Sequence, residues 1–131
     1  MTNIIVKTTK SFTFDAAHFL PDHNGKCANM HGHTYRLEVT VVRDQGKLSN
    51  GGSDEGMVID FVDLKAIVKA EVIDELDHKV LNDVLPFRTT AENMATHIFE
   101  VLTDKLHVSG VIVDHIKLWE TPDSYVEACH E

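Results

Sequence analysis

The chain has 131 residues, 43% of them apolar, which suffices for one hydrophobic core but is short for two. We therefore expect a single domain over residues 1–131. Twelve Lys and Arg stand against 21 Asp and Glu, and the net charge of −9 disfavours nucleic acid and anionic membrane surfaces as partners. No apolar run approaches the roughly 20 residues that cross a bilayer, and no secretory signal opens the chain, so we expect a cytoplasmic protein.

Two strands are predicted in the first third of the chain. Alternation of apolar and polar residues predicts the first strand over Thr8–His18, with His18 at the end of its buried stripe. Turn-forming residues fill 20–30, which we interpret as a loop. Alternation resumes over 31–42 and predicts a second strand, antiparallel to the first if the two form a wide hairpin. The polar stretch 44–56 has no apolar period and is interpreted as a mobile connection.

Two helices are predicted in the middle of the chain. Apolar residues recur at intervals of three and four after Asp60, which predicts an amphipathic helix that Asp60 caps and that ends near Asp77. The same periodicity predicts a second helix that begins at Thr89 or Thr90. At its start a capping box is the favoured interpretation, with Thr89 at the cap and Glu92 reaching back to its amide.

Two further strands are predicted over 111–120 and 124–129, with a tight turn between them. The order ββααββ is typical of an α+β domain in which a four-stranded antiparallel sheet carries two helices on one face. Such an open sheet leaves two unpaired edges, and joining subunits edge to edge is one way to satisfy them. We therefore predict a ring-like homo-oligomer.

Three histidines have the spacing of a metal site. His31 and His33 lie two residues apart, so on a strand their imidazoles share one face. His18 ends the neighbouring strand, where a hairpin would bring its ring alongside. Three neutral nitrogens with one open position are typical of catalytic zinc, although a pair of histidines alone also occurs in ordinary strands. The sequence therefore predicts Zn²⁺ on His18, His31 and His33.

Cys27 and the pair Asp77 and His78 are candidates for proton transfer. Cys27 lies four residues before His31, and a thiol near a cation has its thiolate favoured, so it is a candidate base. The alternative is a cysteine packed as a small apolar residue, which is how we interpret Cys129. A carboxylate beside an imidazole can act as a proton shuttle near neutral pH. The alternative for Asp77 and His78 is a histidine at a helix end and an aspartate in solvent.

Glu120 is a candidate ligand-binding carboxylate. It has the parity of Ile112, Ile116 and Leu118 on its strand, so it is expected to close a buried stripe. Burying an unpaired carboxylate costs roughly several kcal/mol, so a partner is expected there. A ligand with adjacent N–H donors would serve. The alternative is an exposed strand end.

Several motifs occur in order across nearly the whole chain: Phe14-x-Ala16-Ala17-His18, Cys27-x-x-x-His31-Gly32-His33, Val58-Ile59-Asp60-Phe61, Leu76-Asp77-His78-x-x-Leu81-Asn82, Thr90-Ala91-Glu92-Asn93 and Glu120-Thr121. Together they resemble the 6-pyruvoyltetrahydropterin synthase / 6-carboxytetrahydropterin synthase family. The resemblance implies the tunnelling fold, in which trimers close their sheets into a barrel and two trimers stack as a hexamer with active sites between subunits. Two departures from the family pattern are Thr89, where a proline is frequent, and the long connection over 44–56.

The resemblance also implies a substrate and residue roles. The substrate would be 7,8-dihydroneopterin triphosphate, with Zn²⁺ on the three histidines binding its side-chain hydroxyls. Glu120 would anchor the pterin ring through its N–H edge. The other implied residues are Cys27 as general base, Asp77 and His78 as a second proton-handling pair that faces Cys27 from a neighbouring subunit, and Thr90 and Glu92 near the ring.

Two branches of the family differ in their product. The carbon-cleaving branch releases acetaldehyde and triphosphate and leaves 6-carboxytetrahydropterin, an early step toward queuosine and related deazapurines. The compact Cys-x-x-x-His-Gly-His spacing and the short chain favour this branch. The other branch eliminates triphosphate only and gives 6-pyruvoyltetrahydropterin. A non-catalytic metal-binding or pterin-binding protein, and another enzyme of the same fold such as an aldolase or a cyclohydrolase, remain as alternatives.

Overall fold

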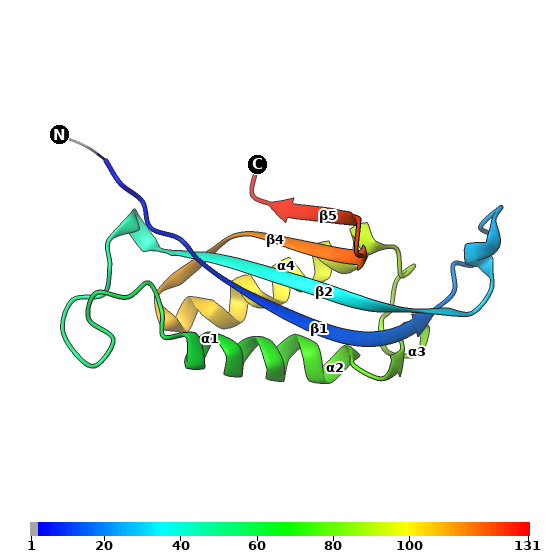
Figure 1. Cartoon of the computed structure of the whole chain (residues 1–131), viewed down its shortest axis with the longest axis horizontal. Coiled ribbons are helices and arrows are strands. Elements are labelled where there is room, and N and C mark those ends of the chain that lie inside the picture. The colour runs from blue at the N-terminus through cyan, green and yellow to red at the C-terminus, as the bar shows by residue number, and fades with distance from the viewer. Residues whose placement is uncertain (1–2) are drawn as a thin grey trace.

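A twisted sheet with its helices gathered on one side makes up the computed structural model, which describes residues 3–131 (Figure 1). Its strands lie in the order β3-β1-β2-β4-β5. All neighbours pair antiparallel except β3, which runs parallel to β1. The predicted α+β class with helices on one face is therefore confirmed. The strands are β1 (Thr8–His18), β2 (His31–Arg43), β3 (Lys79–Val80), β4 (Val111–Thr121) and β5 (Ser124–Cys129).

The predicted four-stranded antiparallel sheet was wrong, because β3 adds a fifth strand and makes the sheet mixed. The two residues of β3 pair with Ala16 and Ala17 at the end of β1. A strand of two residues has no alternation that a sequence pattern can detect. Its pairing also joins distant parts of the chain, so local sequence does not indicate it. The element order is accordingly ββααββ with β3 inserted between the helices.

The predicted first helix is a continuous helical segment with three parts: α1 (Phe61–Val68), a π-helical turn (Lys69–Ile73) and α2 (Asp74–Leu76). It begins and ends as expected from the apolar periodicity. The second predicted helix is α4 (Ala91–Leu106), and a short α3 (Leu81–Val84) precedes it. Short 3₁₀ turns lie in the connections at Lys26–Ala28, Asp44–Gly46 and His107–Ser109.

The two long helical segments are capped by side chains, but one cap differs from the prediction. Thr90 caps α4, since its Oγ1 accepts a hydrogen bond from the Asn93 amide at 3.1 Å. The capping box with Thr89 at the cap was therefore wrong. The Thr89 side chain turns inward, with no solvent exposure, and lies beside His18. A Thr-Thr pair leaves the choice of cap open in the sequence, and the tertiary contact of Thr89 decides it.

Replacing Asp60 with Ala is expected to lower the free energy of unfolding by about 1 kcal/mol. The Asp60 Oδ1 accepts a hydrogen bond from the Val62 amide at 2.8 Å, so the variant leaves this amide without its cap. Urea unfolding measures the change. Asp63→Ala removes a carboxylate from the same first turn without removing the cap, and an equal loss in both variants would contradict the assignment.

The core lies between the sheet and the helices, and the stripe predicted on β1 ends in it at His18. The His18 side chain is only 1% exposed although it is polar. Large side chains of β2 and α4 fill the interior around that stripe. The packing therefore holds His18 at a fixed place under the helix layer. Fully or almost fully buried core residues include Phe14, Tyr35, Leu37, Val39, Leu64, Val68, Met94, Ile98, Leu102 and Leu118.

Two irregularities in β4 change the predicted parity of its side chains. The pairing with β2 shifts near Asp114, so Ile112 is 39% exposed whereas Val113 is buried. The predicted stripe from Ile112 to Glu120 is therefore wrong at its first residue. The pairing with β5 shifts again at Glu120, which stands between two paired residues as an extra residue. A bulge of this kind bends a strand and re-aims its side chain.

The connection between β2 and α1 is organised by its own hydrogen bonds. Ser49 exchanges backbone hydrogen bonds with Gly56 and Met57, each at 2.9 Å. The predicted mobility of this connection is a separate property and stays a prediction. Among the helices of residues 3–131, none combines the length and the apolar content that a membrane crossing requires.

Candidate metal centre and its surroundings

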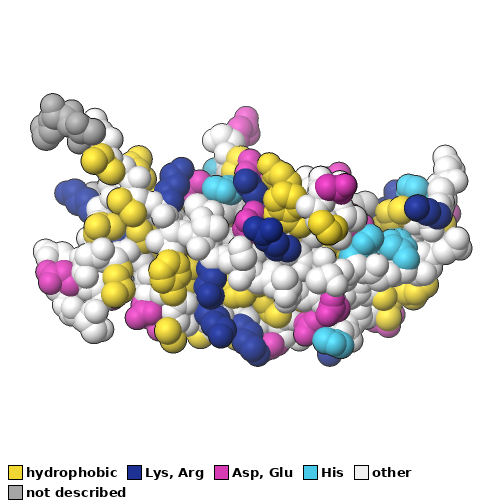
Figure 2. Space-filling view, viewed as in Figure 1, with side chains coloured by type: hydrophobic (Ala, Val, Ile, Leu, Met, Phe, Trp, Pro, Cys, Tyr) yellow, Lys and Arg dark blue, Asp and Glu magenta, His cyan; other side chains and the backbone are white. Residues whose placement is uncertain are grey.

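Three histidine rings meet where β1 ends and β2 begins. His18 pairs directly with His31 across the two antiparallel strands, and His33 pairs with Ala16 two residues away. Paired residues of antiparallel strands project to the same face, so all three rings lie together. The ring centres are 4.6 Å apart for His18 and His31, 5.3 Å for His18 and His33, and 4.9 Å for His31 and His33. Histidine side chains gather on the surface over this end of β1 (Figure 2).

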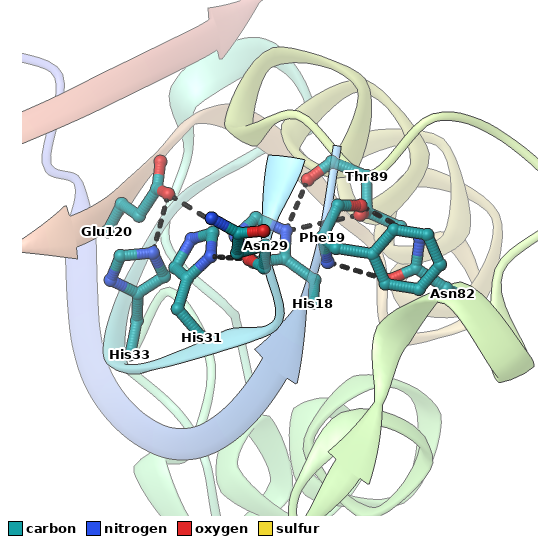
Figure 3. Close-up of polar contacts among 8 residues, drawn as sticks. All are labelled: His18, Phe19, Asn29, His31, His33, Asn82, Thr89 and Glu120. Atoms are coloured by element: carbon teal, nitrogen blue, oxygen red, sulfur yellow. Dashed lines mark hydrogen bonds and ion pairs between the residues drawn. The ribbon is translucent and has the colours of Figure 1, made fainter. Parts of the chain in front are cut away.

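Backbone carbonyl oxygens fix the orientation of two of the rings (Figure 3). His18 Nδ1 lies 2.9 Å from the Thr89 carbonyl oxygen, and His31 Nδ1 lies 2.7 Å from that of Asn29. A carbonyl oxygen only accepts, so each Nδ1 carries the hydrogen, and in the neutral ring the lone pair is then on Nε2. Outer contacts of this kind orient histidines that bind metals.

Glu120 joins the three rings from β4. Its Oε1 lies 2.8 Å from His33 Nε2 and 3.6 Å from His18 Nε2. The possible ligand atoms of His18, His31, His33 and Glu120 all lie within 4.8 Å of one another. The Nε2 atoms of His18 and His33 are buried without a hydrogen-bond partner, an arrangement that native structures rarely leave unexplained. Imidazole nitrogens and a carboxylate oxygen are donors that Zn²⁺ accepts, so these residues fit a divalent metal.

The protonation of these groups favours metal binding. The pKa of the Glu120 carboxyl lies below its usual value because the neighbouring histidine rings, first of all that of His18, stabilise its charged form. The pKa of His33 also lies below its usual value, since burial of the ring outweighs the attraction of Glu120. At neutral pH both directions favour the ionised carboxylate and the neutral imidazole, which are the forms that bind a metal.

Asn82 supports the triad from α3. Its side-chain oxygen accepts from the Phe19 amide at 3.0 Å, and its nitrogen donates to the Phe19 carbonyl at 2.9 Å. These two bonds hold the residue that directly follows His18 (Figure 3). The family motifs contain Asn82 without a role, and the sequence did not indicate that Thr89 and Asn29 contact the histidines. No local pattern indicates contacts that form only in the folded chain.

Asn82→Ala is expected to weaken metal binding about tenfold, as losses of outer contacts around metal ligands do. The variant frees the backbone after His18 and lets its ring leave the position shared with the other two. Competition with a chromogenic chelator measures the metal affinity. Asn50→Ala, in the exposed connection, is the matched control. Equal affinities of both variants and the unchanged protein would contradict this role.

Cys27 lies in a cavity together with two of the histidines. The cavity measures about 430 Å³ and is lined by Lys26, Cys27, Asn29, His31 and His33. Cys27 is half-buried in a 3₁₀ turn, and its carbonyl oxygen accepts from the Leu20 amide at 2.8 Å, which closes the loop. Cys129 is exposed at the end of β5. The structure therefore brings Cys27, but not Cys129, to the histidines.

Asp77 and His78 contact each other at the corner that precedes β3. The two atoms that meet, His78 Nδ1 and Asp77 Oδ2, are 3.0 Å apart, and Asp77 Oδ1 accepts from the Asp15 amide at 2.9 Å. This amide, and next the His78 ring, hold the pKa of Asp77 below its usual value. His78 has a positive φ of 60°, and its amide donates to the Asp15 carbonyl at 2.6 Å, so backbone contacts with β1 fix the strained corner.

His78 and Cys27 line different hollows of the chain. His78 and His33 both line a shallow hollow of about 520 Å³, which does not include Cys27. His33 is common to this hollow and to the Cys27 cavity. Within one chain, His33 therefore borders both spaces, whereas Cys27 and His78 each border only one of them.

Glu92 and Thr90, which the family resemblance implied near the ring, lie at the start of α4. Glu92 lines a cavity of about 110 Å³ together with Glu120, between α4 and the last two strands. The Thr90 hydroxyl oxygen accepts the capping hydrogen bond of α4. The structure thus brings Glu92 to Glu120 and gives Thr90 a structural contact.

Comparisons with known proteins place this geometry in context. A family model described as 6-pyruvoyl tetrahydropterin synthase matches residues 7–131. A Haemophilus influenzae protein named 6-carboxy-5,6,7,8-tetrahydropterin synthase is 41% identical in an alignment of length 142 that covers 92% of this chain and 96% of that protein. A Synechocystis protein of the same name is 46% identical over 103 residues, which cover 78% of this chain and 75% of that protein. The solved structure of Caenorhabditis elegans 6-pyruvoyl tetrahydropterin synthase is 28% identical, with a TM-score of 0.81 over 98% of this chain and 97% of that one.

Proposed function

Because the chain belongs to the 6-pyruvoyl tetrahydropterin synthase family of pterin-processing lyases, we propose that it converts 7,8-dihydroneopterin triphosphate to 6-carboxy-5,6,7,8-tetrahydropterin with release of acetaldehyde and triphosphate. The observation that carries the proposal is the convergence of three imidazoles and Glu120 in a chain 41% identical to a relative named for that product. The product would enter the synthesis of queuosine and related deazapurines, and the reaction would take place in the cytoplasm.

His18, His31 and His33 would hold Zn²⁺ in this proposal. The free Nε2 lone pairs of His18 and His31 and the buried, unpaired Nε2 of His33 support this role. When bound, the ion would supply a Lewis acid that polarises a hydroxyl group of the substrate side chain and lowers its pKa.

Cys27 would be the general base. Its cavity shares two of the triad histidines, so a substrate side chain placed against the rings would also lie near the thiol. A thiolate can accept a proton, and reactive cysteines are typically partly exposed, as Cys27 is. Asp77 would orient His78 through the 3.0 Å contact, which makes the pair a second proton-handling unit.

The two proton-handling units would meet through a second copy of the chain. Cys27 and His78 line different hollows of one chain, which favours a site that takes His78 from a neighbour. The sheet has edges that such a neighbour could pair with, since β3 covers only the last part of β1 and β5 is the outer strand on the other side. Unpaired edges favour addition of strands from another chain. We propose a ring of three chains, and a hexamer of two such rings.

Glu120 would anchor the pterin ring by accepting hydrogen bonds from its adjacent N–H groups, with Glu92 and Thr90 near the ring. The support for this role is the cavity that Glu120 shares with Glu92 and the ionised state that the histidine rings favour for its carboxyl group.

Incubation of the zinc-loaded protein with 7,8-dihydroneopterin triphosphate tests the proposal. Release of acetaldehyde together with triphosphate is the expected result. Triphosphate without acetaldehyde would instead indicate the pyruvoyl branch, after which the C. elegans protein is named. Binding of the substrate without release of either product would indicate a non-catalytic pterin-binding protein.

A further inference from the structure

Glu120 reaches the histidines through an irregularity of its strand. Trp119 pairs with Tyr125 and Thr121 pairs with Ser124, so Glu120 is an extra residue between them. Bulges commonly occur next to active sites, where they re-aim a side chain. The three histidines of the candidate metal site come from β1 and β2, and Glu120 is the one residue of the site that comes from β4.

The contacts of Glu120 Oε1 fit those of a ligand atom that faces the same centre as the ring nitrogens. It lies 2.8 Å from His33 Nε2, yet that nitrogen has no aligned hydrogen bond. Two ligand atoms that bind the same metal ion lie close together without a hydrogen bond between them. With metal–ligand bonds of about 2.0–2.2 Å, neighbouring atoms of a tetrahedral site are roughly 3.3–3.6 Å apart. The distance to His18, 3.6 Å, matches that separation, and the distance to His33, 2.8 Å, is the shorter one that an ion pair gives.

Glu120 is held less firmly than His18 and His31. Carbonyl oxygens anchor the second ring nitrogens of these two histidines, whereas among residues 3–131 the Glu120 carboxylate has no hydrogen bond or ion pair beyond its contacts with His18 and His33. The Glu120 side chain is 30% exposed, against 1% for His18. It also borders two spaces, the small cavity beside Glu92 and a hollow of about 460 Å³ that includes Trp119. The carboxylate therefore has room to move away from the rings.

We propose that Glu120 is a fourth, exchangeable ligand of the metal in the resting protein, and that it leaves the metal when another ligand enters the site. The three histidines then hold the ion, while Glu120 closes the position at which chemistry takes place. The released carboxylate becomes free to accept hydrogen bonds from an incoming molecule. The identity of that molecule, a pterin, rests on the proposed function.

The visible absorption of the Co²⁺-loaded protein, which reports the donor set, tests this proposal with azide as the incoming ligand. Glu120→Gln and Glu120→Ala are expected to change the Co²⁺ spectrum and to bind azide about tenfold more tightly than the unchanged protein. The factor follows if Glu120 occupies the metal in about nine-tenths of the molecules, because azide affinity falls with the fraction of molecules whose position is open. Glu127→Gln, a carboxylate of β5 outside the group, is the matched control and should match the unchanged protein.

Equal spectra and equal azide affinities in all four proteins would overturn the proposal. Loss of Co²⁺ from both Glu120 variants would also overturn it, because Glu120 would then be a permanent ligand. Circular dichroism establishes that the variants are folded. The assay contains no pterin, so failure of the proposed reaction leaves the result for Glu120 unaffected.

Discussion

Cys27→Ala is expected to lower kcat for acetaldehyde release by about 10³-fold while the protein keeps its zinc. General bases contribute roughly 10²- to 10⁴-fold, and the variant removes the thiol nearest to the triad in its cavity. The three histidines and their carbonyl contacts are unchanged, so metal affinity should be unchanged too. Steady-state assays measure kcat, and elemental analysis of the purified variant measures bound zinc.

Cys129→Ala is the matched control, because Cys129 is exposed at the end of β5 and lies outside the Cys27 cavity. Its kcat should equal that of the unchanged protein. Turnover that persists in Cys27→Ala would contradict the assignment of the base. Loss of zinc from that variant would show instead that Cys27 binds the metal.

The triad could be predicted because its geometry follows from local patterns. Alternation fixes His18 on the buried face of β1 and sets the parity of His31 and His33 on β2. The antiparallel pairing of His18 with His31 then needs only the hairpin. The sequence did not decide whether Asp77 and His78 contact each other, because the side chains of adjacent residues need not touch. The positive φ of His78 and its hydrogen bond to Asp15 decide that question.

Glu120 shows where sequence reasoning ends. Its parity with Leu118 indicated a buried carboxylate that needs a partner, but not that His33 is this partner. Two facts decide the partner, the pairing of β4 with β2 and the bulge at Glu120 itself. Both depend on contacts between segments far apart in the chain, as do the pairing of β3 and the inward turn of Thr89. The periodicity of apolar residues predicts which face of an element is buried. It does not predict which other segment of the chain packs against that face.

His31→Ala is expected to abolish turnover by removing the metal. The triad would retain two imidazoles, and the loss of affinity should be at least the roughly 10- to 100-fold that follows loss of an outer contact. His31 is only partly buried, so the variant leaves the core of the sheet intact. His107→Ala, at an exposed histidine after α4, is the matched control and should keep both metal and activity. Elemental analysis and the acetaldehyde assay measure the two quantities.

A chelator separates loss of the metal from damage to the fold. Chelation of the unchanged protein should abolish turnover and lower the free energy of unfolding by about 4 kcal/mol if free zinc had been present at a thousandfold excess over its Kd. Added zinc should restore both quantities in the unchanged protein, because the imidazoles and Glu120 remain in place. The same addition should restore neither in His31→Ala. If that variant bound zinc as tightly as the unchanged protein and turned over, the metal would lie elsewhere, and the roles proposed for Cys27, His78 and Glu120 around the triad would lose their basis.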